Sequence, residues 1–547
     1  MTELFVNTLK ELGYECEVKI SKSKAADYQF DGCFKLAKKY HKAPIQIANE
    51  IASKLKKYDY FANLEVAGGG FINITVSDKY ICDKMRKLIN STSLVPQDTG
   101  FYILDYGGPN VAKPLHVGHL RSAIIGQAIN NILKYKGYKI ISDVHLGDFG
   151  LQIGQVIYGI LKDNPNKNVS DISFDLDYLN VTYPKMSALC KENEEVKKEC
   201  ALITKKLQDG NSDYRILWKQ IMDVSITDIK RIYKFLSVDF DLWYGESDAY
   251  KYFEKLFKKL NDYIIIDDGA KIIDVKNDND KKEIPPCIIE KSDGAFLYST
   301  SDLGTILQRE EDYHPDGIIY IADERQSMHF TQVFRVCKKA HIFDGALEHH
   351  GFGTVNGEDN KPFKTRSGGA LKLEDLIKET RENFINLREE NKNMPKDDLD
   401  KIINAILKFA DLQNNMERNY IFDIKKFSEV NGKTGPYILY TYLRINKITS
   451  SNYDLSDTIY NEYDRTLRLK LLEVSGVIDL AALERRPHYI ADYLYELATC
   501  TNNFYQNNRM NEIEGKQKDD FNTLLTFNNR VIKELLGLLG IEIPSAM

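Results

Sequence analysis

Apolar residues near the start of the chain follow two different periods. Ile47, Ile51 and Leu55 are spaced as on one face of a helix, which predicts a helix over residues 45–55. After three consecutive glycines, apolar and polar residues alternate over 71–76, and this alternation predicts a strand. Residues 1–92 are therefore expected to form a small α+β domain.

A different pattern begins at Phe101. Helical stretches separate short apolar runs at 102–104, 139–142 and 318–322. Strands that alternate with helices predict a parallel sheet with crossover helices, the Rossmann-type arrangement of α/β proteins. We expect such a domain over residues 93–375, with an insertion at about 160–285 where the regular alternation is lost.

Strand signals stop after Leu371. Apolar residues at helical spacing mark one helix around 399–407 and another around 490–497. We therefore expect residues 376–547 to form a helical bundle. The chain has no internal repeat.

Charge and composition restrict the class of protein. The 547 residues include 74 Lys or Arg and 80 Asp or Glu, a formal net charge of −6, which argues against a protein that coats nucleic acid nonspecifically. Residues 1–90 differ, with 15 Lys or Arg against 11 Asp or Glu. A solvated basic face and a surface that contacts RNA both remain open for this domain.

Membrane and metal signals are weak. No apolar run approaches the ~20 residues that cross a bilayer, and the N-terminus begins polar, so neither a membrane span nor a secretory signal is expected. The eight cysteines include no CxxC pair and no ligand-like spacing to a histidine. We expect reduced thiols, a cytoplasmic protein and no metal-binding residues.

The segment from Asp105 to Ser122 carries the most specific chemical signal. A strand is followed by a loop rich in Gly and Pro and then by a helix that opens with His116 and His119. Three residues apart, the two imidazoles lie on one face of the first turn, where free backbone N–H groups and the positive end of the helix dipole also point. They can donate hydrogen bonds to a phosphoryl oxygen there.

Two neighbouring residues strengthen this interpretation. Lys113 adds a positive charge just upstream, and Gly118 removes a side chain so that a flat ring such as adenine can approach the backbone. Two isolated histidines at this spacing are more often ordinary surface or core residues. Their combination with a strand, a Gly/Pro loop and a lysine predicts a nucleotide site.

The string PNVAKPLHVGHLRS within this segment resembles the HIGH signature of class I aminoacyl-tRNA synthetases, and over its full length it is similar to arginyl-tRNA synthetases. The similarity covers nearly the whole chain, and further matching stretches lie at 146–150, 292–294, 298–302, 326–330 and 538–541. Gly107 and Gly108 depart from the family, which usually has one or two serines there. Any hydroxyl contact to the substrate at these positions is lost.

The resemblance implies that the chain activates L-arginine with ATP and Mg²⁺ and transfers the arginyl group to the 3′ end of the arginine tRNA. It implies that the amino acid is held by Asp105, Asn110, Tyr298, Asp302 and Gln326. A guanidinium is a planar fork that never loses its charge, so a selective pocket needs carboxylates to receive it. Without the resemblance, Asp302 is more often a helix N-cap, Asp105 a strand-end ion pair and Tyr298 a packed aromatic.

The family positions near ATP match His116, Gly118, His119 and His329. Taken alone, His329 is nearly as often a half-buried histidine with satisfied hydrogen bonds as a residue that contacts the nucleotide. The catalytic residues implied are His116, His119, Lys113, Lys364 and Arg366. The last two lie in a basic loop, 361–369, which stands where class I enzymes carry a KMSK-like signature. The match is poor there, and the arginine enzymes are thought to use the lysine upstream of the HIGH block instead. Without the family, this loop is an exposed basic turn.

The same resemblance makes the helical region an anticodon-binding domain, with Tyr437, Tyr440 and Arg444 as tRNA-binding residues. Tyrosines can stack on splayed bases, although aromatics at helical spacing are more often core. The N-terminal domain would contact the tRNA elbow, and a monomer is expected. A synthetase for another amino acid, a nucleotidyltransferase without tRNA and a non-catalytic RNA-binding relative remain alternatives.

Overall fold

His116 and His119 follow the first strand of a parallel sheet. The computed structural model describes residues 1–547 except 293, 295, 358–360, 362, 364–370 and 450–453. The sheet has the order β11-β10-β5-β6, and every pair of neighbours is parallel. Its strands are β5 (Phe101–Tyr106), β6 (Lys139–Asp143), β10 (Gly317–Asp323) and β11 (Ala346–Phe352). The parallel sheet of the predicted α/β fold is therefore confirmed.

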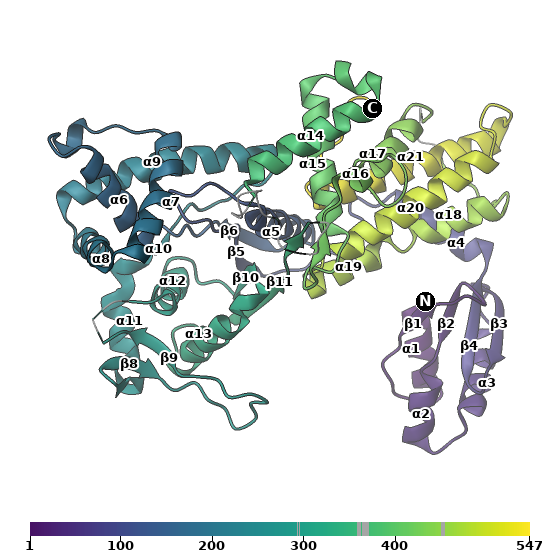
Figure 1. Ribbon diagram of the computed structural model, residues 1–547. Helices are drawn as coiled ribbons and strands as arrows, with labels where there is room; N and C mark the ends of the chain where they lie inside the picture. Colours follow the sequence, from purple (N-terminus) through teal and green to yellow (C-terminus); the bar gives the residue numbers. More distant parts are fainter. Residues whose placement is uncertain (293, 295, 358–360, 362, 364–370, 450–453) are drawn as a thin grey trace. The chain divides into compact units, whose positions relative to one another are not determined.

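Helices cover both faces of this sheet (Figure 1). On one face, α5 (Val117–Tyr135) lies directly on β5, because a Cβ at Gly126 would meet the Tyr106 ring at 2.1 Å. On the other face, α12 (Tyr298–Tyr313) and α13 (Ser327–Lys339) share a core with the strand residue Ile103. Because alternate residues face opposite sides of a sheet, Asp105 points toward α12 and Tyr106 toward α5.

The predicted insertion follows β6. Helix α6 (Leu151–Asp163) packs against α7 (Leu176–Glu192), and Gly159 permits the approach because a Cβ there would meet Thr182 Cγ2 at 2.5 Å. The remaining elements are α8 (Glu194–Gln208), α9 (Ser212–Phe235), α10 (Glu246–Ala249), α11 (Phe253–Leu260) and the antiparallel strands β7 (Ile265–Asp267), β8 (Ala270–Ile273) and β9 (Cys287–Glu290).

The chain after β11 is mainly helical. It contains α14 (Leu373–Leu387), α15 (Lys396–Leu412) and α16 (Ile424–Phe427), together with the short strands β12 (Val355–Asn356) and β13 (Tyr420–Ile421). The expectation that strands stop after Leu371 is wrong at β13, which pairs with β12 in parallel. Two residues are too few to produce an alternating pattern in the sequence, and a distant partner forms this pair.

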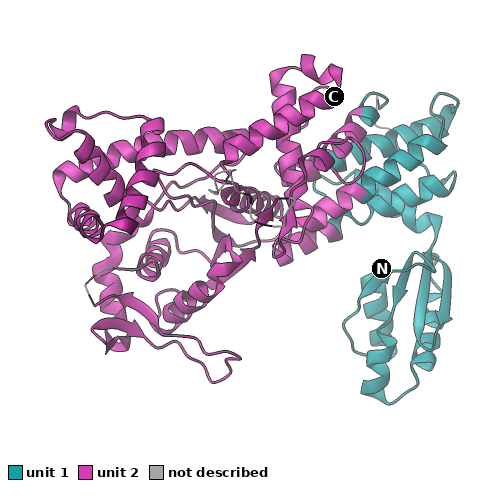
Figure 2. Ribbon diagram, viewed as in Figure 1, with its two compact units in different colours: residues 1–94, 444–475, 496–532 teal, residues 95–443, 476–495, 533–547 magenta. Residues whose placement is uncertain are grey.

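The structure divides into two compact units (Figure 2). One unit comprises residues 1–94, 444–475 and 496–532, and the other comprises 95–443, 476–495 and 533–547. The first unit begins with α1 (Thr2–Glu11), β1 (Ile20–Lys22), β2 (Tyr28–Phe30), α2 (Cys33–Tyr40), α3 (Pro44–Leu55), β3 (Phe61–Ala67), β4 (Phe71–Val76) and α4 (Asp78–Ile89). Its sheet is antiparallel, with the order β1-β2-β4-β3. The predicted helix at 45–55 and strand at 71–76 are present as α3 and β4.

The C-terminal region is a set of helices. They are α17 (Gly435–Asn446), α18 (Glu462–Leu471), α19 (Val474–Glu484), α20 (His488–Asn507) and α21 (Gly515–Leu538). Within the first unit, Arg465 of α18 donates to both carboxylate oxygens of Asp27, each at 2.7 Å. Three consecutive domains with boundaries near 92 and 375 stay a prediction. In the part of the chain that the structure describes, no helix is long and apolar enough to span a bilayer.

Candidate active site

The two histidines form the N-terminal cap of α5. His116 is the N-cap residue, and its Nδ1 accepts a hydrogen bond from the Gly118 N–H at 3.1 Å. The Nδ1 atom of His119 accepts one from the His116 N–H, also at 3.1 Å. The two rings stack with their centroids 3.8 Å apart. Because both Nδ1 atoms are acceptors, each neutral ring carries its proton on Nε2.

Both rings are held in the neutral form. Burial, followed by the charges of His116 and Lys113, lowers the pKa of His119 to about 3. Burial and Lys113 also lower the pKa of His116. At neutral pH the start of α5 therefore presents two uncharged imidazoles, whose Nε2–H groups donate to no backbone oxygen of the described residues. These groups, with the positive end of the helix dipole, suit an anionic oxygen.

Gly118 is needed by this cap as well as by any ligand. A Cβ at position 118 would lie 2.9 Å from His116 Cε1 and 3.0 Å from its Nδ1. A side chain there would displace the His116 ring from its capping position. The sequence explains the glycine only by the approach of a flat ring, and the structure adds this second reason.

Lys113 contacts an aromatic ring contributed by the insertion. Its Nζ lies 4.6 Å from the centroid of the Tyr183 ring, on α7. Within the described ranges, no carboxylate lies at ion-pair distance from Lys113 Nζ, whereas its charge acts on both histidines. Sequence reasoning missed Tyr183, because nothing in the α7 pattern distinguishes it from other half-buried aromatics.

Asp105 is bound by an arginine of the protein itself. Arg309 Nη2, on α12, donates to Asp105 Oδ2 at 2.5 Å and to Asp143 Oδ2 at 2.7 Å. Burial lowers the pKa of the Arg309 guanidinium, but the two carboxylates more than offset this and hold it well above its usual value. Asp105 is thus a strand-end ion pair, as the sequence alone would suggest, and this pair occupies one of its two oxygens.

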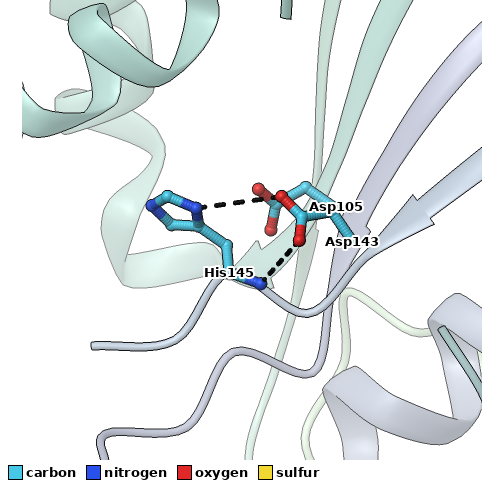
Figure 3. Close-up of side chains that lie close together, drawn as sticks. All are labelled: Asp105, Asp143 and His145. Carbon is cyan, nitrogen blue, oxygen red and sulfur yellow. Dashed lines mark hydrogen bonds and ion pairs between the residues drawn. The ribbon is translucent and has the colours of Figure 1, made fainter. Parts of the chain in front are cut away.

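His145 lies beside the same carboxylates (Figure 3). Ligand atoms of Asp105, Asp143 and His145 lie within 4.8 Å of one another, a spacing that a metal ion would accept. Arg309 forms an ion pair with both carboxylates, so the cluster is part of an ion-pair network. His145 has φ +40°, and neither ring nitrogen has a hydrogen-bond partner among the described residues.

Asp302 and His329 interact directly. His329 Nε2 lies 2.5 Å from Asp302 Oδ2. A residue expected to bind the arginine substrate therefore contacts a residue expected to bind ATP. Helix α12 begins at Tyr298 with Leu297 as its N-cap, so Asp302 lies inside the first turns and is not the cap. Tyr298 is 61 % exposed at the start of the helix and open to a ligand.

The acidic residues gather at the carboxyl edge of the sheet. Asp105 on β5 is the register partner of Tyr320 on β10. Burial raises the pKa of the Tyr320 hydroxyl well above its usual value; the Arg309 charge opposes this, and the charges of Asp105 and Asp302 add to it. Burial also raises the pKa of Glu246, at the start of α10, to about 7, with added effects of Asp148 and Asp302. Sequence reasoning missed Glu246, which lies in the predicted insertion.

The two remaining residues that are expected to bind the arginine substrate differ in their surroundings. Asn110 Oδ1 accepts a hydrogen bond from Gln152 Nε2 at 3.3 Å, whereas Gln326 is exposed at the end of a short 3₁₀ turn before α13. The loop between β5 and Asn110 also explains the missing serines. Gly107 has φ +77°, and a Cβ at Gly108 would lie 2.7 Å from the His145 carbonyl oxygen.

Lys364 and Arg366 lie outside the described residues. The three residues expected to bind tRNA are described. Tyr440 is 42 % exposed and lines a cavity of about 350 Å³ together with Asp398 and Met547. Tyr437 packs against Tyr495 at 5.8 Å, and the Arg444 guanidinium lies 4.3 Å from the centroid of Tyr505.

Family models match most of the chain. A model described as "tRNA synthetases class I (R), catalytic domain" matches residues 37–424. A second model, described as "DALR anticodon binding domain", matches residues 438–547. Together they cover the sheet, the insertion and the C-terminal helices.

Curated proteins and solved structures agree with these matches. The chain is 41 % identical to an arginine–tRNA ligase of Alkaliphilus oremlandii over 95 % of this chain and 94 % of that protein. It is 38 % identical to an arginine–tRNA ligase of Agathobacter rectalis over 100 % of this chain and 98 % of that protein. Arginyl-tRNA synthetase from Plasmodium falciparum has a similar fold, with TM-score 0.85 at 23 % identity over 100 % of this chain and 98 % of that chain. The Thermus thermophilus arginyl-tRNA synthetase gives TM-score 0.82 at 21 % identity over 100 % and 99 %.

Proposed function

The chain belongs to the arginyl-tRNA synthetase family, and we propose that it activates L-arginine with ATP and transfers the arginyl group to the 3′ end of the arginine tRNA. The observation that carries the chemistry is the stacked, uncharged pair of His116 and His119 at the start of α5. The pair lies at the carboxyl edge of a parallel sheet, where such folds bind nucleotides. Acidic groups suited to a guanidinium lie at the same edge.

The first step needs positioned charge and no protein nucleophile. The carboxylate of arginine attacks the α-phosphorus of ATP, a carboxyl–phosphate bond forms, and the bond to pyrophosphate breaks. Negative charge then grows on the phosphate and pyrophosphate oxygens. The Nε2–H groups of His116 and His119 and the ammonium of Lys113 are the proposed donors to these oxygens. Lys364 and Arg366 stay proposed contacts to pyrophosphate, and Gly118 and His329 stay proposed contacts to the nucleoside.

The arginine side chain is proposed to bind where acids lack a cationic partner. Among the described residues, no Lys or Arg forms an ion pair with Glu246, and the ion-pair partner of Asp302 is His329. A guanidinium brought between them would supply the missing positive charge. Asp105 contributes the oxygen that Arg309 leaves free. Tyr298, Asn110 and Gln326 complete the proposed contacts to the amino acid.

Mg²⁺ is proposed to arrive with ATP. Among the described residues, the cluster of Asp105, Asp143 and His145 is the one with metal-ligand spacing, and Arg309 Nη2 already donates to one oxygen of each carboxylate. These residues do not fit a resident Mg²⁺ site. The cation is accordingly treated as part of the nucleotide substrate, and no step depends on a protein-held metal.

The tRNA is proposed to contact the C-terminal helices and the N-terminal domain. The exposed ring of Tyr440, at a cavity of about 350 Å³, suits a splayed base, since stacking on an aromatic side chain tolerates any base. Tyr437 and Arg444 are the further proposed contacts on α17. We also propose that the chain acts as a monomer in the cytoplasm, where tRNA is charged.

ATP–pyrophosphate exchange with a panel of amino acids, with and without the arginine tRNA, tests this function. Of the amino acids in the panel, only arginine is expected to support exchange. Formation of arginyl-tRNA should then follow. Exchange with lysine or glutamine but not with arginine would overturn the substrate assignment. No exchange with any amino acid, even with tRNA present, would instead indicate a non-catalytic RNA-binding relative.

A further inference from the structure

We propose that Tyr183, on helix α7 of the insertion, is a positioning residue for the activation step, and that its ring holds the Lys113 ammonium beside the nucleotide site. The inference rests on the proposed role of Lys113 in neutralising phosphate charge. It assigns a function in catalysis to a part of the chain outside the Rossmann-type alternation.

Lys113 needs a partner to stay in place. Its ammonium ends a flexible stem, and fixing such a side chain costs conformational entropy. No carboxylate among the described residues lies at ion-pair distance from it, whereas the Tyr183 ring centroid lies 4.6 Å from its Nζ. In this position its charge lowers the pKa of both His116 and His119, so it lies close to the proposed phosphate donors.

An aromatic ring has an advantage over a carboxylate at this position. An aspartate or glutamate would neutralise the ammonium and compete with a phosphate for it. The negative face of a ring attracts the cation without cancelling its charge, and the opposite side of the ammonium remains free to donate hydrogen bonds. The lysine is therefore oriented and still able to bind an anion.

Tyr183 is held rigidly enough to act in this way. Its neighbours Thr182 and Met186 are buried against α6, where Gly159 allows the two helices to approach closely. Helix α6 is in turn tied to the site, because Gln152 Nε2 donates to Asn110 Oδ1. The insertion is thus anchored beside the proposed substrate residues.

The test compares Tyr183→Leu, Tyr183→Phe, Lys113→Ala and the double variant Lys113→Ala/Tyr183→Leu in ATP–pyrophosphate exchange with the arginine tRNA present. Tyr183→Leu removes the ring and should lower kcat/KM for ATP by about 2-fold to 30-fold, the range of a cation–π contact. Tyr183→Phe keeps the ring and should retain activity near that of the wild type. In the Lys113→Ala background, Tyr183→Leu should have no further effect.

A matched control lies on the same helix. The Tyr178 hydroxyl donates to Asp163, and the ring that Lys113 contacts is that of Tyr183, so Tyr178→Leu should leave kcat/KM for ATP unchanged. Equal losses in Tyr178→Leu and Tyr183→Leu would overturn the inference, since both would then act through the stability of α7. Equal losses in Tyr183→Phe and Tyr183→Leu would also overturn it.

The Lys113→Ala variant separates the proposed role of Lys113 from that of Tyr183. Wild-type activity in Lys113→Ala would remove the proposed role of Lys113, and the inference with it. In another outcome, Lys113→Ala lowers kcat/KM for ATP, and adding Tyr183→Leu lowers it again by the full factor seen in the single variant. Tyr183 would then act independently of the lysine, and only the inference about Tyr183 would be refuted.

Discussion

Replacement of Glu246 by glutamine should stabilise the protein and weaken arginine binding at the same time. Burial raises the pKa of this carboxyl to about 7, against an ordinary value of 4.5. The folded protein therefore keeps, between these two pH values, a proton that the unfolded chain releases. Ionised Glu246 destabilises the fold, and a guanidinium in the proposed pocket would relieve this cost.

The size of the effect follows from the pKa and its sign. Because the folded pKa lies above the unfolded one, the penalty is absent below about pH 4.5, grows as the pH rises, and is complete above about pH 7. A rise from 4.5 to about 7 corresponds to at most about 3 kcal/mol, and residual solvent contact reduces this to about 1–3 kcal/mol. The neutral glutamine avoids the penalty but keeps an oxygen that can accept a hydrogen bond from the Phe149 N–H.

Thermal midpoints of the wild type and Glu246→Gln, measured at pH 5 and pH 8 without substrates, check the stability part. The variant should melt a few degrees higher at pH 8 and by clearly less at pH 5, where only about a quarter of the penalty is present. KM for arginine should rise about 10-fold to 100-fold, the range of a charge-assisted hydrogen bond. The exposed Glu192→Gln on α7 serves as a control and should change neither quantity. A stability gain that is equal at both pH values would refute the reasoning from burial, and an unchanged KM would remove Glu246 from the arginine pocket.

Three further substitutions probe other parts of the molecule. His119→Ala should lower the rate of ATP–pyrophosphate exchange about 10²-fold to 10³-fold, with a stability loss no larger than that of a helix cap, about 1 kcal/mol; wild-type turnover would exclude the histidine site. Arg121→Met leaves Asp411 buried without its ion-pair partner and should cost about 3–5 kcal/mol in denaturant unfolding, much of it recovered when Asp411→Leu is added. Gly108→Ser places a Cβ 2.7 Å from the His145 carbonyl oxygen and should cost about 1–3 kcal/mol in the same measurement; no loss would mean that the loop relaxes.

The sequence located the elements whose burial produces a local pattern. The apolar runs at 102–104, 139–142 and 318–322 are three strands of the parallel sheet, because strands covered on both faces are apolar throughout. The fourth strand, β11, escaped prediction because Glu348, His349 and His350 interrupt its apolar character. The strand β13 escaped because two residues carry no period.

The site was predicted where the signal is local and missed where it depends on distant residues. His116 and His119 stand three residues apart in one turn, so their stacking follows from helix geometry. Arg309 binds Asp105 and Asp143 from 204 and 166 residues away, and no spacing in the sequence indicates such a contact. The roles carried over from the family, including those of Lys364 and Arg366, stay predictions.

Loss of water has opposite consequences in the two halves of the proposed site. In the nucleotide half it keeps His116 and His119 neutral, which is the form that their donor role requires. In the arginine half it leaves Glu246 partly protonated near pH 7, although a guanidinium needs the ionised form. Arginine binding must then release a proton from this carboxyl.

The released proton can be counted by calorimetry in buffers of different ionisation enthalpy. The observed binding enthalpy, plotted against the ionisation enthalpy of the buffer, has a slope equal to the number of protons released. Since about half of Glu246 is protonated at a pH equal to its pKa of about 7, this slope should correspond to about half a proton per arginine at pH 7. It should approach zero at pH 9, where the carboxyl is already ionised, and be absent at both pH values in Glu246→Gln. A slope that persists unchanged at pH 9 or in the variant would mean that another group releases the proton, and that Glu246 does not bind the guanidinium of arginine.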